Sequence, residues 1–180
     1  MTVVISQTVL VVAEPFGDAL DAERVAAAIG RGMEADAQRE RGGRFECDLF
    51  PIETSAAAGQ STRPIVARPA TRRNTGRRTG SDTRRGAGSA LLDALGFDER
   101  MRAARAVVIA RGRLDDRTLA GTLAFEVATR ARQAGVPAYA VTGENALDPF
   151  EARIVDLQVI LEASTPRALS AAGRKLAALV

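Results

Sequence analysis

The chain has 180 residues and a formal net charge of +3, and its 46% hydrophobic and 26% charged content is typical of one globular domain. It has no histidine and one cysteine, Cys47, which excludes an intramolecular disulfide, a cysteine-built metal site and a nucleophile that depends on a histidine base. Acid–base chemistry must therefore rest on carboxylates or on the one lysine, Lys175. No apolar run of 18 residues and no basic leader is present, so we expect a cytoplasmic protein without a membrane partner.

The N-terminal part predicts a strand, a helix and a second strand. Gln7–Ala13 is a continuous apolar, β-branched run that predicts a buried strand. Apolar residues at helical spacing predict a helix near Ala19–Asp36, with Asp18 or Asp21 as its cap. Alternating apolar residues predict a second strand over 45–49, with Cys47 as a core residue rather than a reactive thiol.

The positive charge is concentrated in the segment 54–89. This segment has eight arginines and one acid, so it carries +7 and the rest of the chain −4. Because it is rich in Gly, Pro, Ser and Thr and poor in large apolar residues, we expect a disordered loop. A phosphate-binding arm for nucleic acid or an acidic protein is the functional alternative. No aromatic side chain is interleaved for base stacking, so we favour a solvated linker.

The C-terminal part alternates helices and apolar strands. Short helices are expected at Ser89–Leu95 and Asp98–Ala104, strands at Ala106–Ala110, Ala138–Val141 and Leu157–Leu161, and helices at Thr118–Ala134 and from a Ser164 or Thr165 cap to about Leu179. This alternation predicts one α/β domain over 1–180, built as a three-layer, mostly parallel Rossmann-like sheet with helices on both faces.

A charged motif, RGRLDD (111–116), follows the strand at Ala106–Ala110. Ligands bind at the carboxyl ends of strands in open α/β sheets, so Arg113 and Asp115 are candidates to hold an anion and a metal or proton. Glu14 would lie at the same edge of the sheet, with a solvated loop position as the alternative. The Gly-Glu-Asn stretch at 143–145 would also lie there and could line the cleft, although such a loop is more often a simple turn. The structural alternative is that Asp115 or Asp116 caps the next helix and pairs with a nearby arginine.

Three stretches of the sequence resemble the type I glycerate kinase family. They are VVAEPFGDALDAERVAAAIGRGM at 11–33, LLDALGFDERMRAARAVVIARGRLDDRTLAG followed by ARQAGVPAYAVTG within 91–143, and ASTPRALSAAGRKLA at 163–177. Members of that family are about twice as long and have two domains, so the resemblance implies one domain without the inserted second domain. The segment 54–89 would then take the place of that insertion.

The chain departs from the family pattern at charged positions. The family's Asp-Ser-Phe-Lys corresponds to residues 14–17, so Glu14 replaces the aspartate and Gly17 the lysine. In the family's GEGRLD motif the glutamate position is Arg111, and the lysine of LAGK is Thr122. Because phosphoryl transfer depends on neutralising charge, these changes predict loss of full kinase activity.

Three functions follow as hypotheses. The first is a truncated glycerate-kinase-like domain that binds a small anionic metabolite or a nucleotide, or assembles with a partner chain or a second copy. The second is an active kinase that uses ATP and Mg²⁺ to phosphorylate glycerate. The third is an interaction module that binds through its arginine segment. If the chain acts as a kinase, six residues are the candidates for its site: Asp115 as base or metal ligand, Glu14 as a catalytic carboxylate, and Arg113, Gly112, Thr118 and Arg111 in substrate binding.

Overall fold

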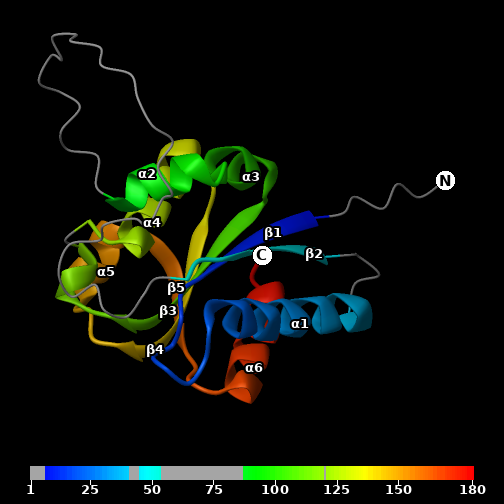
Figure 1. The fold of residues 1–180 in the computed structure, drawn as a ribbon. Helices are drawn as coiled ribbons and strands as arrows, with labels where there is room; N and C mark the ends of the chain where they lie inside the picture. Colours follow the sequence, from blue (N-terminus) through cyan, green and yellow to red (C-terminus); the bar gives the residue numbers. More distant parts are fainter. Residues whose placement is uncertain (1–6, 41–44, 54–86, 120) are drawn as a thin grey trace, which may run out of the picture.

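The computed structural model describes residues 7–40, 45–53, 87–119 and 121–180. Within them lie five strands and six α-helices, with one short 3₁₀ helix, η1 (Asp116–Leu119) (Figure 1). The strands are β1 (Gln7–Ala13), β2 (Phe45–Pro51), β3 (Ala106–Leu114), β4 (Ala138–Asn145) and β5 (Leu157–Glu162). The helices are α1 (Ala22–Glu40), α2 (Ala87–Ala94), α3 (Phe97–Ala103), α4 (Leu123–Ala134), α5 (Pro149–Val155) and α6 (Pro166–Ala177).

The strands form one parallel sheet in the order β2-β1-β3-β4-β5. The chain moves from β1 to β2 on one side and then crosses back to place β3 on the other side of β1. The point where the direction of winding reverses therefore lies between β1 and β3, and this is where open α/β sheets bind ligands. The predicted α/β class and parallel sheet are confirmed.

Helices cover both faces of the sheet, as the alternating pattern predicted (Figure 1). Helices α1 and α6 pack on one face, around a core that includes Val11, Ile29 and Leu169. Helices α2 to α5 pack on the other face, around Leu10, Phe97 and similar side chains. Burial of these apolar side chains is the main stabilising contribution, worth about 1.5–3 kcal/mol for each large aliphatic residue.

Helices α1 and α6 approach each other at two glycines. A Cβ at Gly32 would lie 2.0 Å from the carbonyl oxygen of Ser170, and one at Gly173 would lie 2.2 Å from that of Ile29. Only a residue without a side chain fits at these two places, so the pair of helices is specified by glycine.

Arg130 of α4 ties together the helices of the opposite layer. Its guanidinium donates to Glu126 at 2.9 Å, Asp93 at 2.7 Å and Asp98 at 3.0 Å, and to the carbonyl and hydroxyl oxygens of Ser89. Its side chain is only 12% exposed. Burial lowers the pKa of Arg130, but the hydrogen bonds to the three carboxylates outweigh it and raise the pKa above its usual range.

Arg100 of α3 anchors the edge strand β2. It pairs with Asp48 through two nitrogens, donates to the carbonyl of Leu49 at 3.0 Å, and lies 4.4 Å from the centre of the Phe50 ring. The hydrogen bond to Asp48 is the main reason that the pKa of Arg100 is raised.

Several boundaries differ from the sequence predictions. The predicted helix Thr118–Ala134 is wrong at its start, because η1 ends at Leu119 and α4 begins at Leu123 after the cap Thr122. The predicted strands at Ala106–Ala110 and Ala138–Val141 each run four residues further, so Gly143–Asn145 is strand and not a turn. Helix α5 was not predicted at all.

Two predicted helix caps are confirmed, and one predicted segment falls mostly outside the described residues. Asp21 caps α1 by accepting from the Arg24 amide at 2.7 Å, and Thr165 caps α6. The predicted disordered loop 54–89 lies outside the described residues except for its last three positions, where the prediction is wrong because α2 begins at Ala87. None of the helices in the described ranges is long and apolar enough to cross a membrane.

Candidate functional site

The candidate site lies where β3 and β4 continue beyond the end of β1. The pairing of β1 with β3 ends at Ala13 and Ala110, whereas β3 and β4 remain paired up to Leu114 and Asn145. We call residues 111–114 and 142–145 the β3–β4 extension. It projects from the carboxyl edge of the sheet, next to the β1/β3 position where ligands bind in this topology.

An ion pair joins β3 to the end of β1. Arg111 Nη1 donates to Glu14 Oε2 at 2.6 Å and to Oε1 at 2.9 Å, and Arg111 Nε donates to the carbonyl of Arg113 at 3.1 Å. The side chains are 9% exposed for Glu14 and 27% for Arg111. The structure thus brings together two predicted site residues that neutralise each other.

Glu14 is the buried titratable group of this edge. Burial raises the pKa of the Glu14 carboxyl, and the charge and hydrogen bonds of Arg111 reduce this rise without cancelling it. The alternative of Glu14 as a solvated loop residue is wrong, because the residue is 7% exposed.

Arg113 lies two residues further along the same face of β3. Its Nη1 donates to Glu144 Oε2 at 2.5 Å, and its Nε donates to Asp115 Oδ2 at 3.2 Å. Glu144 is the residue directly opposite Arg113 in the register of β3 and β4. Arg113 and Glu144 are both more than half exposed, at 54% and 57%. Asp115 and Arg113 therefore form the pair that the motif predicted, with Glu144 as an added partner.

Thr118 holds the loop that carries Asp115. The Asp115 amide donates to the Thr118 hydroxyl at 3.1 Å, and the Thr118 amide donates to the Asp115 carbonyl at 2.9 Å. Thr118 is completely buried, so its hydroxyl stabilises the loop and does not face a ligand. The prediction that Asp115 or Asp116 caps the long helix is wrong, because Thr122 caps α4 by accepting from the Phe125 amide.

Gly112 lets the loop after β1 lie against β3. A Cβ at Gly112 would be 3.4 Å from the Phe16 Cα, and one at Gly143 would be 2.7 Å from the carbonyl oxygen of Gly112. The role of Gly112 is thus the close approach of three backbone segments, which positions Glu14 beside Arg111.

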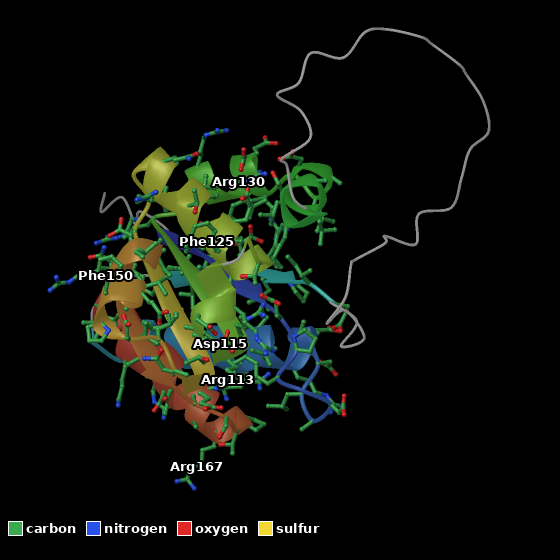
Figure 2. The ribbon with its side chains drawn as sticks, turned by 90° about the vertical axis from the view of Figure 1, so that its left-hand side faces the viewer. Arg113, Asp115, Phe125, Arg130, Phe150 and Arg167 are labelled. Carbon is green, nitrogen blue, oxygen red and sulfur yellow. The ribbon has the colours of Figure 1, made fainter. Side chains whose placement is uncertain are left out.

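A hollow of about 750 Å³ opens beside the β3–β4 extension. It is lined by Arg113, Asp115, Asp116, Arg117, Ala146, Asp148 and Glu151. Figure 2 shows Arg113 beside Asp115, well away from Arg130. The hollow combines arginines that suit an oxyanion with carboxylates that suit a cation.

The carboxylates of the hollow already have partners. Asp148 accepts from the amides of Phe150 and Glu151 at 2.8 Å, which caps α5. In the described part of the chain, no three or more His, Cys, Asp or Glu residues are grouped so that they could hold a metal ion. Magnesium would fit here only if it entered with nucleotide phosphates and took Asp115 as one ligand, since Mg²⁺ commonly binds through one or two carboxylates plus phosphates.

Cys47 lies apart from this site, in β2. Its Sγ is 3.8 Å from the carbonyl oxygen of Gly30. Burial and the charge of Glu34 raise the pKa of its thiol to about 12. The thiolate form, which is the nucleophile, is therefore suppressed. Cys47 is partly buried and packs against the core, so it is less enclosed than the predicted core position.

Sequence reasoning missed Glu144 as the partner of Arg113, and it missed Asp148 and Glu151. The signature of α5 was nevertheless present, because Asp148 and Glu151 stand three apart in a capping box with a proline after the cap. The register that places Glu144 opposite Arg113 depends on the length of both strands, which the apolar pattern underestimated.

Comparison with known proteins yields a family match and matches among solved structures. The model of the glycerate kinase family matches residues 78–179, more than half of the chain. A protein of Salmonella typhimurium LT2 provisionally named glycerate kinase 2 is 19% identical, with a TM-score of 0.39 over 50% of this chain and 25% of that one. An oxidoreductase from Corynebacterium diphtheriae is 11% identical, with a TM-score of 0.48 over 97% of each chain.

These structural likenesses are too low to bear on function. The matched part spans a quarter of the Salmonella chain. None of the curated proteins matches the chain. The family match covers the β3–β4 extension, η1 and the hollow, whereas Glu14 and the helix α1 lie outside it.

Proposed function

The chain belongs to the glycerate kinase family, and from this premise we propose that the β3–β4 extension binds a small anionic metabolite of the glycerate type without completing phosphoryl transfer on its own. The site keeps Arg113 as an anion-binding arginine, and it lacks a free Glu14 carboxylate and the two lysines that would support transfer.

The ion pair of Glu14 and Arg111 carries the proposal. In the family pattern an acid is expected at the position of Arg111, so two carboxylates would face each other across β1 and β3. Here Arg111 takes both oxygens of Glu14, at 2.6 and 2.9 Å. A carboxylate that is neutralised and buried in this way is not available to a metal ion or to a substrate proton.

The two lysine positions of the family pattern support the same conclusion. Gly17 is an exposed residue with a φ of +63°, a backbone conformation that suits a turn glycine. Thr122 is used as the cap of α4 and donates its hydroxyl hydrogen to the carbonyl of Thr118. Neither position supplies a cation for a moving phosphoryl group, whose charge must be neutralised for transfer to be fast.

Two arginines, Arg113 and Arg117, line the hollow, and Arg113 is the one that the family motif retains. Its guanidinium lines the hollow, is 54% exposed and is oriented by Asp115. A guanidinium presents its donors in a planar fork that matches the two oxygens of a carboxylate or phosphate. These properties favour Arg113 as the group that binds the ligand's negative end.

Calorimetric titration with D-glycerate tests the binding part. We expect wild type to release heat that saturates, and Arg113→Ala to lose it. Arg105→Ala is the matched control, because Arg105 is an exposed arginine just before the opposite end of β3, and it should bind like wild type. Glycerol, which lacks the carboxylate, should not bind. Equal binding by wild type and Arg113→Ala would refute the proposed site.

An active glycerate kinase is the second candidate, and one observation favours it. Asp115 and Arg113 lie together on the wall of the hollow, with an Nε to Oδ2 distance of 3.2 Å. Asp115 would then hold Mg²⁺ together with ATP phosphates, or accept the proton of the substrate hydroxyl, while Arg113 holds the carboxylate. Release of ADP that depends on glycerate separates the two candidates.

A further inference from the structure

Two arginines on one face of β3 are each paired with a glutamate, and the two pairs differ in their exposure to solvent. Arg111 is paired with Glu14, which directly follows β1 and whose side chain is 9% exposed. Arg113 is paired with Glu144, and both of these side chains are more than half exposed. The first pair is enclosed by the fold, whereas the second can open without disturbing the core.

The exposed pair is easily exchanged. Ion pairs between solvent-exposed side chains contribute little to stability, because water and salt screen the charges and two flexible side chains must be ordered. Opening the Arg113–Glu144 pair therefore costs little. The guanidinium stays oriented when Glu144 leaves, since Asp115 accepts from its Nε at 3.2 Å.

We propose that Glu144 occupies the carboxylate position of the site and must be displaced from Arg113 before a ligand carboxylate binds there. This inference rests on the proposed function and adds its regulation: an internal carboxylate competes with the ligand for Arg113 Nη1. The 2.5 Å distance from Nη1 to Glu144 Oε2 marks the place that the ligand oxygen takes.

The ligand class follows from this exchange. The occupant of the site in the free protein is a carboxylate, so the site already accepts the shape and charge of that group. A ligand that carries a carboxylate replaces one such group by another, and its hydroxyl groups then face the hollow. Glu144 lowers the apparent affinity by the fraction of time that it holds Arg113.

Calorimetric titration of Glu144→Gln with D-glycerate tests the competition. The amide keeps the shape of the side chain but removes its charge, so we expect glycerate to bind about two- to fivefold more tightly than to wild type. Glu99→Gln is the matched control, because Glu99 is exposed on α3 and its loss changes the net charge equally. The double variant Arg113→Ala with Glu144→Gln should lose binding, which shows that the gain acts through Arg113.

The outcomes distinguish this inference from the proposed function. Equal affinities of wild type, Glu144→Gln and Glu99→Gln would overturn the competition and leave the binding site standing. Binding by Glu144→Gln alone would support the competition and show that wild type does not take up glycerate. No binding by any of the three proteins would overturn both.

Discussion

Glu14 and Arg111 lie 97 residues apart in the chain and form the ion pair on which the account of the site depends. Sequence analysis placed Glu14 at the correct edge of the sheet, because it follows the apolar run of β1. It did not predict the pairing, since an arginine after a strand is equally compatible with solvent exposure. The pair depends on β3 lying directly beside β1, which is a property of the topology.

Arg111→Ala is expected to destabilise the fold by about 1–3 kcal/mol at pH 7, because it leaves the buried Glu14 carboxylate without its cation. Arg113→Ala, which removes an exposed arginine from the same strand, should cost less than about 1 kcal/mol. Urea unfolding of the three proteins measures the difference. Equal losses would mean that the Glu14–Arg111 pair contributes no more than a surface pair.

The loss in Arg111→Ala should shrink as the pH falls from 7 towards 5. Burial raises the pKa of Glu14, and removing Arg111 raises it further. An acid whose folded-state pKa lies above its unfolded-state pKa destabilises the fold at high pH, and this cost disappears as the pH falls through the folded-state value. The same unfolding curves at pH 7 and pH 5 test this. A loss that is independent of pH would mean that Glu14 has the same protonation state in the folded variant as in folded wild type across this range.

At the scale of elements, the apolar strands and most helices could be predicted, whereas the polar ends of strands could not. Arg, Gly, Glu and Asn after an apolar run are typical of loops, yet here they continue β3 and β4. The extension is stabilised by backbone pairing and by opposite charges facing each other at Arg113 and Glu144. Helix α5 has only seven residues, too few to show a helical period, and only its capping box distinguished it from a loop.

The helices α2, α3 and α4 are expected to depend on Arg130. Arg130→Ala removes the cation shared by Glu126, Asp93 and Asp98, and we expect a loss of about 2–3 kcal/mol. Arg132→Ala, an exposed arginine in the last turn of the same helix, should change stability by less than about 0.5 kcal/mol. Thermal unfolding measures both, and similar melting temperatures for the two variants would refute this role.

The contact between α1 and α6 is expected to tolerate no side chain at Gly32. Gly32→Ala places a Cβ 2.0 Å from a backbone oxygen of α6, so the helices must separate, at about 1–3 kcal/mol. Gly30→Ala is the matched control, because its Cβ meets the movable tip of Leu49 at 3.1 Å. It should stay within about 1 kcal/mol of wild type, since alanine also favours the helix. Unfolding in urea distinguishes the two variants.

For the whole molecule, the order β2-β1-β3-β4-β5 places the β3–β4 extension next to the reversal of winding between β1 and β3, and the family match covers this extension. Sequence reasoning reached the fold class, the edge of the sheet and Arg113 with Asp115. It placed 143–145 at that edge but did not predict the pairing of Glu144 with Arg113 or the hollow, because these depend on strand register and on a helix that the sequence hardly marks. The proposed site is built without the segment rich in arginine, most of which lies outside the described residues.

Deletion of residues 62–85 is therefore expected to leave glycerate affinity within about twofold of wild type. If that segment instead binds an anionic polymer such as nucleic acid, its deletion would abolish polymer binding, which weakens steeply with salt, and would leave glycerate binding unchanged. Titration of the shortened chain with D-glycerate checks this. A large loss of glycerate affinity would mean that the ligand's negative charge is held by the deleted arginines and not by Arg113.

The most direct test of the account is release of ADP from MgATP with saturating D-glycerate, measured on wild type and Asp115→Asn once calorimetry has shown bound glycerate. We predict no glycerate-dependent release by wild type above that of the variant, because Glu14 is neutralised by Arg111 and both lysine positions of the family pattern lack a cation. Turnover by wild type that Asp115→Asn lacks would contradict the account and establish that this chain is a working kinase.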